Sequence, residues 1–106
     1  MNGICWGTFT GRELTGYLIA VDSGSCYHLV NLAVDPAHRH KGIARTMLRK
    51  LLRTALDNGK RSVQLEVRRS NRSAIKLYRS EGFVEVDVKP RYYEDNEDAL
   101  VFSVSI

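Results

Sequence analysis

The stretch LAVDPAHRHKGIARTMLRKLL, residues 32–52, decides the fold because it joins the end of an apolar segment to a long helical pattern. Pro36 stops the apolar segment, since proline cannot continue a strand interior. After Gly42, one stripe of apolar side chains recurs at helical spacing: Ile43, Met47, Leu48, Leu51, Leu52, Ala55 and Leu56. The pattern predicts a helix over residues 42–56, which Asn58 and Gly59 terminate.

On the N-terminal side of this helix, the sequence predicts two strands. Residues 13–22 follow a glycine-containing turn at 10–12, and residues 27–36 run up to the proline. No internal repeat or linker composition divides the 106 residues, so we expect one domain over residues 1–106.

On the C-terminal side, SVQLEV (62–67) alternates apolar and polar residues and predicts a strand. SNRSAIKLYRSEGF predicts a second helix, with Ser70 or Asn71 as its cap and Gly82 closing it. FVEVDV and DALVFSVSI predict two final antiparallel strands. The order predicts an α/β (α+β) fold, a mixed sheet flanked by helices.

The composition bounds the class of protein. Its hydrophobic fraction of 43% and charged fraction of 26% are typical of soluble globular domains. No apolar run approaches the roughly 20 residues of a membrane span, and MNGICWGTF lacks the features of a signal peptide. Cys5 and Cys26 form no CxxC motif, so we expect free thiols in a reducing cytoplasm; a disulfide between two strands is the alternative.

The net charge of +4 is unevenly distributed. Most basic residues lie between Arg39 and Arg79, whereas most acids come later. A basic middle indicates an anionic partner, either nucleic acid or a phosphate-bearing cofactor, and a solvated helix face is the alternative. Nucleic acid is the weakest of these readings because the basic residues lack interleaved aromatic side chains.

Gly42 stands where a strand-to-helix loop could hold a phosphate. A glycine there allows close backbone approach and leaves free N–H groups at the positive end of the helix dipole. Neither a Walker loop nor a Rossmann fingerprint is present. On this evidence alone, a plain turn is the competing interpretation.

Residues 32–52 resemble the acetyl-CoA-binding segment of the GNAT N-acetyltransferases. Their Q/R-x-x-G-x-G/A pattern corresponds here to Arg39, Gly42 and Ala44. The resemblance implies that the pantetheine arm pairs with Leu32, Ala33 and Val34. It also implies a pyrophosphate loop whose members are Arg39, His40, Lys41, Gly42, Ile43, Ala44 and Arg45.

LEVRRSNRSAIKLYRSEGF and RYYEDNEDALVF resemble the corresponding segments of RimI-type acetyltransferases, which modify protein N-termini. The resemblance implies Glu66 as general base, Tyr78 as general acid and Asn71 as a cofactor contact. It also implies Tyr92 and Tyr93 as acceptor contacts. The structural alternatives are a solvated strand glutamate, a core tyrosine, a helix cap and two tyrosines packed on the sheet.

The resemblance begins at about residue 14, and the family places a strand and two helices before that point. We therefore expect an N-terminally truncated fold with an exposed apolar face, which a second copy covers in a homodimer or strand-exchanged assembly.

The acidic run EDNED (94–98) could favour a cationic amine or a basic partner, or could be a solvated loop. His28, His38 and His40 form no convincing metal set, because no carboxylate or cysteine completes one, so no metal site is predicted.

The resulting hypothesis is an acetyl-CoA-dependent N-acetyltransferase that acts on the α-amine of a protein N-terminus. Its alternatives are an acetyltransferase for small-molecule amines and a truncated CoA-binding domain without turnover. We expect acetyl-CoA as co-substrate and no nucleic-acid or membrane partner.

Overall fold

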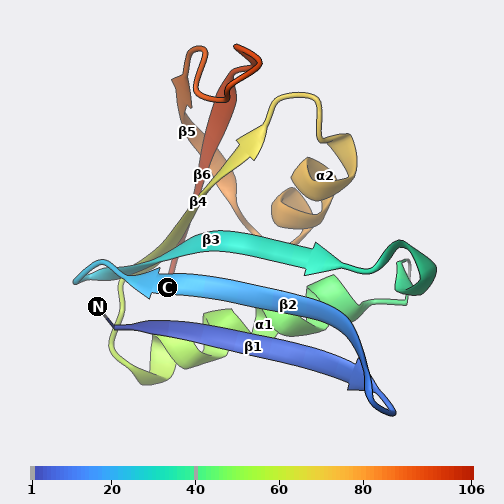
Figure 1. The fold of residues 1–106 in the computed structure, drawn as a ribbon. Coiled ribbons are helices and arrows are strands. Elements are labelled where there is room, and N and C mark those ends of the chain that lie inside the picture. The colour runs from blue at the N-terminus through green and yellow to red at the C-terminus, as the bar shows by residue number, and fades with distance from the viewer. Residues whose placement is uncertain (1, 40) are drawn as a thin grey trace.

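The computed structural model describes residues 2–39 and 41–106. Its elements are β1 (Gly3–Thr10), β2 (Glu13–Asp22), β3 (Cys26–Val34), a short 3-10 turn (Pro36–His38), α1 (Ile43–Asp57), β4 (Ser62–Arg68), α2 (Arg72–Ser80), β5 (Val84–Lys89) and β6 (Ala99–Ser105). The strands form a six-stranded sheet in the order β1-β2-β3-β4-β6-β5 (Figure 1). The predicted mixed α/β sheet is confirmed, with each predicted element within about two residues of its observed bounds.

Strand β1 was not predicted, since the first strand expected from the sequence covers residues 13–22. It pairs with β2 along its whole length in an antiparallel hairpin, with an irregularity between Thr8 and Phe9. Gly11 adopts φ 62° in the turn, a conformation that glycine reaches without strain. Gly3 and Gly7 weaken the local strand signal, so β1 depends on its pairing with β2.

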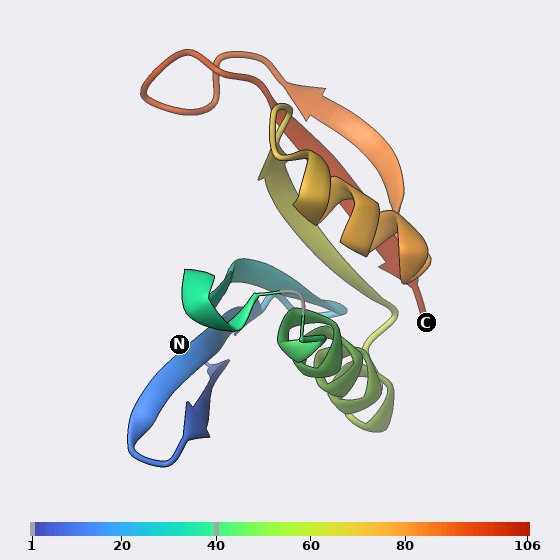
Figure 2. The ribbon, with the colours of Figure 1, turned by 90° about the vertical axis from the view of Figure 1, so that its right-hand side faces the viewer.

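The sheet separates in its middle. All neighbouring strands are antiparallel except β3 and β4, which pair in parallel only from Cys26 with Ser62 to Leu29 with Leu65. Beyond this point β3 continues to Val34 and β4 continues to Arg68, but the two strands no longer pair with each other. Figure 2 shows the two halves of the sheet diverging beyond this point. The C-terminal part of β3 therefore has a free backbone edge toward β4.

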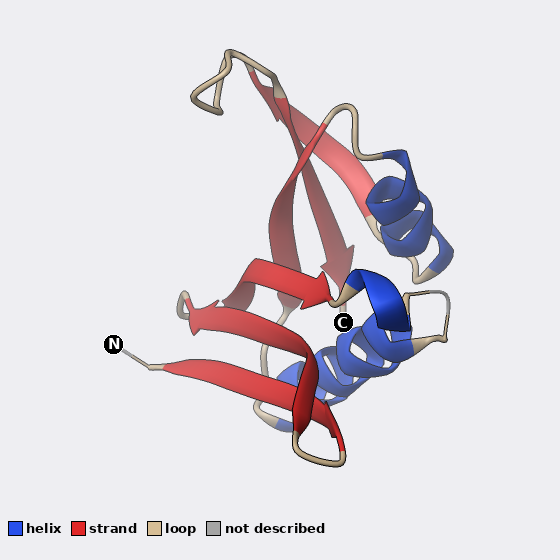
Figure 3. Cartoon of the chain, turned by 45° about the vertical axis from the view of Figure 1, so that its right-hand side comes forward, coloured by secondary structure: helices blue, strands red, loops and turns tan. Residues whose placement is uncertain are grey.

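Both helices pack on one face of β4. Val63, Leu65 and Val67 alternate on this face, and they belong to the same buried cluster as Leu48 of α1 and Tyr78 of α2. The amphipathic stripe predicted for α1 is the buried one, since Leu48 and Leu51 are both fully buried. Figure 3 shows the helices beside the sheet.

Apolar side chains remain exposed on several strands, as the sequence predicts. Those more than 45% exposed include Phe9, Leu14, Val30, Val84 and Val86. Among the described residues, no helix covers the face of β4 that carries Gln64 and Glu66. This uncovered face is called the open face below.

The two helices are also joined by charge. Glu81, just after α2, accepts hydrogen bonds from Arg45 Nη1 at 2.6 Å and from Arg49 Nε at 2.7 Å. These contacts lower the pKa of Glu81, chiefly through the hydrogen bond from Arg49. Only 7% of the Glu81 side chain is exposed, so its carboxylate has lost most of its contact with water. The two guanidinium groups offset the cost of burying this negative charge.

Both cysteines are free thiols. Cys5 lies on β1 and Cys26 on β3, and β2 separates these strands in the sheet. Among the described residues, no helix is long and apolar enough to cross a membrane.

Candidate active site

A cavity of about 220 Å³ lies where β3 and β4 separate. The residues that line it come from β3, β4, α2 and the β5–β6 connection: Leu29, Val30, Asn31, Leu32, Leu65, Glu66, Val67, Arg68, Asn71, Ala74, Tyr78 and Tyr93. Five of the predicted site residues meet here, namely Leu32, Glu66, Asn71, Tyr78 and Tyr93. They come from separate segments of the chain, and the sheet topology alone brings them together.

Glu66 enters the site from the open face of β4. Its Oε1 atom lies 2.8 Å from Nε2 of His28 and its Oε2 atom 3.7 Å from Nζ of Lys89. Its side chain is only 12% exposed, so the solvated-glutamate alternative is wrong for this position. An ionised carboxylate only accepts hydrogen bonds, so the proton of the His28 contact then lies on Nε2.

Tyr78 enters from the helix side. Its ring packs edge-on against Phe83 with centroids 5.6 Å apart, and 8% of the residue is exposed. Burial raises the pKa of Tyr78 to about 12, with a smaller contribution from Tyr93. The residue belongs to the core and also lines the cavity, so the structural and the functional interpretation describe the same position.

Asn71 is the N-cap of α2. Its side-chain oxygen accepts a hydrogen bond from the backbone N–H of Ala74 at 3.2 Å. The helix-cap interpretation is therefore confirmed. Because Asn71 also lines the cavity, its amide nitrogen is a candidate donor to a ligand.

The N-terminus of α1 has the geometry of an anion site. Gly42 is the N-cap with φ 79°, and no side chain of residues 2–39 and 41–106 caps the helix. A Cβ atom on Gly42 would meet no other part of the described chain within 4 Å, apart from the adjoining residues. The first N–H groups of the helix, on Ile43, Ala44 and Arg45, have no partner within the helix.

The basic side chains of this loop differ in the partners to which they donate hydrogen bonds. Arg39 Nε donates to the carbonyl of Val34 at 3.3 Å, and Arg45 Nη1 donates to Ser80 and Glu81. Lys41 is exposed, and His40 lies outside the described residues. Arg45 therefore contributes to the loop mainly through its backbone, while its side chain holds α2.

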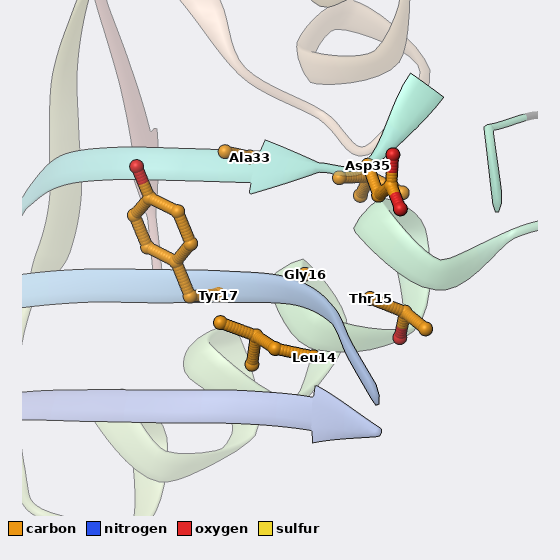
Figure 4. A pocket seen from close by; sticks show the side chains of 7 residues that line it. Leu14, Thr15, Gly16, Tyr17, Ala33 and Asp35 are labelled. Atoms are coloured by element: carbon orange, nitrogen blue, oxygen red, sulfur yellow. The ribbon is translucent and has the colours of Figure 1, made fainter. Parts of the chain in front are cut away.

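A second cavity of about 230 Å³ lies between the ends of β2 and β3 (Figure 4). It is lined by Leu14, Thr15, Gly16, Tyr17, Ala33, Val34 and Asp35. The three residues predicted to pair with the pantetheine arm therefore line two different cavities. Leu32 lines the cavity between β3 and β4, whereas Ala33 and Val34 line the cavity between β2 and β3. What the three residues share is the backbone edge that faces β4.

The two predicted acceptor tyrosines are also divided. Their rings pack edge-on with centroids 5.0 Å apart, but only Tyr93 lines the first cavity. Tyr92 is 50% exposed and carries Lys89 Nζ 5.2 Å above its ring centroid. Burial raises the pKa of Tyr93, partly offset by the nearby Arg68 guanidinium.

The acidic run holds its own loop against the end of β4. Arg68 Nη1 lies 2.9 Å from Asp95 and 3.0 Å from Glu97, and Arg69 lies 3.3 Å from Asp98. Arg68 also stacks over Tyr93, with its guanidinium carbon 4.1 Å from the ring centroid. Much of the charge of this run is therefore paired within the chain, through Asp95, Glu97 and Asp98.

Contrary to the expectation that no carboxylate completes a metal set with the histidines, two carboxylates lie near His38. Its ligand atom lies within 4.8 Å of those of Glu13 and Asp35, a spacing compatible with a metal ion. His38 Nδ1 is 3.4 Å from Asp35 Oδ2, while Asp35 Oδ1 accepts from the backbone of Ala37. Glu13 is exposed, and exposed acidic groups of this kind are common without an ion.

Sequence reasoning missed His28, Lys89 and Arg68 as members of the site. His28 and Lys89 reach Glu66 from β3 and β5, and Arg68 orders the tyrosine loop. Alternation assigns each residue to a face, but only the register between strands makes them neighbours.

Comparison with known proteins agrees with this geometry. The model of the acetyltransferase (GNAT) family matches residues 1–83. The chain is 38% identical over 81 residues to the [ribosomal protein bS18]-alanine N-acetyltransferase of Escherichia coli K12, covering 74% of this chain and 55% of that protein. It is 40% identical over 91 residues to the N-alpha-acetyltransferase RimI of Mycobacterium tuberculosis, covering 82% and 56%.

The fold agrees as well. The crystal structure of the ribosomal-protein-S18-alanine N-acetyltransferase from Escherichia coli superposes with a TM-score of 0.91 at 31% identity, covering 98% of this chain and 69% of that one. The chain spans about half the length of the two curated relatives. With its splayed strands, its glycine-capped helix and these relatives, the chain belongs to the acetyltransferase (GNAT) family.

Proposed function

We propose that this chain transfers an acetyl group from acetyl-CoA to the α-amino group of a protein N-terminus. The observation that carries the proposal is the cavity between β3 and β4, where Glu66 and Tyr78 meet from opposite sides of the sheet. The names of the two curated relatives, which denote N-terminal acetylation, support the same acceptor class.

The structure offers two features that fit acetyl-CoA. The free edge of β3 beyond Leu29 can pair with the amide groups of a pantetheine arm. The uncapped N-terminus of α1 at Gly42 can receive a pyrophosphate through backbone N–H groups. When bound there, acetyl-CoA would supply the acetyl group as a thioester.

Glu66 is the proposed general base. An acceptor amine must lose its proton, and a carboxylate within hydrogen-bond reach, or one water away, can accept it. Glu66 suits this role because its side chain lines the cavity and is held by His28. The open face gives the acceptor an approach that no described helix blocks.

Tyr78 is the proposed general acid. Its pKa of about 12 keeps the phenol protonated at neutral pH, so the hydroxyl has a proton to give to a leaving thiolate. Its burial on the helix side separates it from Glu66, so that base and acid act on opposite sides of the transferred group.

An N-terminal amine is the easiest protein acceptor for such a site. An α-amino group has a pKa near 8, so reaching the neutral form at pH 7 costs about 1 kcal/mol. A lysine side chain, with a pKa near 10.4, costs about 4–5 kcal/mol. A single carboxylate base therefore suffices more readily for the α-amine.

We also propose that the protein acts in the cytoplasm and as a homodimer. Free Cys5 and Cys26 support a reducing compartment. The exposed apolar side chains on β1, β3 and β5 support a second copy as their cover. Sedimentation at micromolar concentration tests the assembly, and a well-folded monomer would contradict it.

The test of the activity is a transfer assay with three sets of acceptors: peptides with free N-termini, the same peptides with blocked N-termini, and small primary amines. We expect CoA release and peptide acetylation only with free N-termini. Transfer to small amines alone would favour the alternative acceptor class. Binding of acetyl-CoA without any transfer would leave a CoA-binding domain.

A further inference from the structure

Lys89 lies in the surroundings that the resemblance assigns to the acceptor amine. Lys89 pairs in register with Ala99, and Glu66 pairs with Val101 on the other side of β6. Since alternate residues of β6 point to the same face, Lys89 and Glu66 share the open face of the sheet. Lys89 Nζ is 3.7 Å from Glu66 Oε2 and 5.2 Å from the ring centroid of Tyr92.

Glu66 is the proposed base and Tyr92 a predicted acceptor contact, so the chain presents its own ammonium group to both. The Lys89 side chain is 46% exposed, and four rotatable carbons separate its nitrogen from the backbone. A lysine held this loosely can move from the carboxylate toward the cavity that Glu66 lines.

We propose that Lys89 is a self-acetylation site, a proposal that rests on the proposed acetyl transfer. The Lys89 ammonium gives one proton to Glu66, and its nitrogen lone pair attacks the thioester carbonyl carbon of acetyl-CoA. A C–N bond forms and the C–S bond breaks. The thiolate of CoA leaves with the proton of Tyr78, and the attacking nitrogen releases its second proton to water, from which the Tyr78 phenolate is reprotonated. The products are an ε-N-acetyl amide and free CoA.

The reaction is slow but favoured by proximity. Lysines are neutral at pH 7 in a fraction about 10²–10³-fold smaller than α-amines, which slows attack. Tethering the nucleophile beside its base offsets this loss, because an intramolecular acceptor needs no binding step. Each chain is then modified once. The neutral product cannot pair with Glu66, so the modification also changes the charge at the base.

The experiment incubates the purified chain with acetyl-CoA and follows peptides by mass spectrometry after digestion. Residues 80–91, released by cleavage after Arg79 and Arg91, contain Lys89 as their single lysine. Lys76 on α2 is the internal control, because it is exposed and would be modified by uncatalysed acetylation. A free N-terminal peptide in a parallel reaction reports the proposed function.

We expect one acetyl group on Lys89, a first-order rate that does not change with protein concentration, and a rate at least tenfold above that of Lys76. Glu66→Gln should remove this advantage. Lys89→Arg, which keeps a cation beside Glu66, should abolish the modification at this position while the slow acetylation of Lys76 stays unchanged.

Three results overturn the inference while the proposed function stands: peptide acetylation without modification of Lys89, equal rates at Lys89 and Lys76, or a rate that rises with protein concentration. If neither the peptide nor Lys89 is acetylated, the proposed function fails and the inference fails with it.

Discussion

Glu66 and His28 lie 2.8 Å apart on neighbouring parallel strands, joined through Oε1 and Nε2. His28 is the residue before Leu29, where the pairing of β3 with β4 ends, so the contact stands at the closed end of the splayed strands. It fixes one carboxylate oxygen and leaves the other, Oε2, with the more distant Lys89. His28 is thus a positioning residue for the proposed base.

Glu66→Gln should lower kcat by about 10²–10⁴-fold, the range that removal of a general base commonly produces. The affinity for acetyl-CoA should stay nearly unchanged, because the proposed cofactor contacts lie on β3 and at Gly42. Turnover assays and calorimetric titration measure the two effects separately. His28→Gln leaves the carboxylate in place, so its kcat should lie between those of the wild type and of Glu66→Gln. Wild-type turnover in Glu66→Gln would remove the residue from the mechanism.

Tyr78 should make stability depend on pH in the alkaline range. Its pKa rises from an ordinary 10.0 to about 12 on folding, so the unfolded chain releases this proton first. The stabilising contribution is complete below pH 10 and is lost as pH rises toward 12, by about 2–3 kcal/mol. Urea unfolding across this range should show a smaller alkaline loss for Tyr78→Phe. An identical loss in both proteins would contradict the raised pKa.

Gly42→Ala should weaken the binding of acetyl-CoA as well as the fold. At φ 79° an alanine costs about 1–2 kcal/mol of backbone strain. Gly59 provides a matched control, because it adopts φ 71° with equally open surroundings after the other end of α1. Both variants should lose similar stability by thermal unfolding, but only Gly42→Ala should lose affinity. Equal affinities would exclude the loop as the pyrophosphate site.

Glu81→Gln should destabilise the protein by about 1.5–3 kcal/mol at neutral pH, since it weakens charged hydrogen bonds to Arg45 and Arg49. The folded pKa is lowered, so this contribution is present above the ordinary carboxyl pKa of 4.5 and is lost as pH falls below it. Asp57→Asn, which breaks an exposed pair with Arg53 at 3.4 Å, is the control and should cost below about 1 kcal/mol. Chemical unfolding of the two variants decides the comparison.

The sequence predicted the elements whose signal is local. The apolar stripe of α1 and the alternation of β4 are such signals, and the structure confirms both. Strand β1 was missed because two glycines interrupt a stretch that pairing with β2 stabilises. The cap role of Asn71 was predicted as an alternative to ligand contact, and the structure shows the cap.

The site could be predicted only as far as the resemblance names its members. His28 and Lys89 meet Glu66 because of the register of β3 and β5, which no local pattern contains. The ion pairs of Asp95, Glu97 and Asp98 could not be predicted from the sequence, since their partners Arg68 and Arg69 lie at the end of β4. Long-range charge pairing of this kind requires the fold.

The most direct test of the account is mass spectrometry of a peptide library incubated with acetyl-CoA and the purified chain, together with measurement of CoA release. We predict acetyl groups on free peptide N-termini, one CoA released for each acetyl group transferred, and near-complete loss of both signals in Glu66→Gln. Absence of peptide acetylation by a chain that binds acetyl-CoA, or equal acetylation by Glu66→Gln, would contradict the central claim.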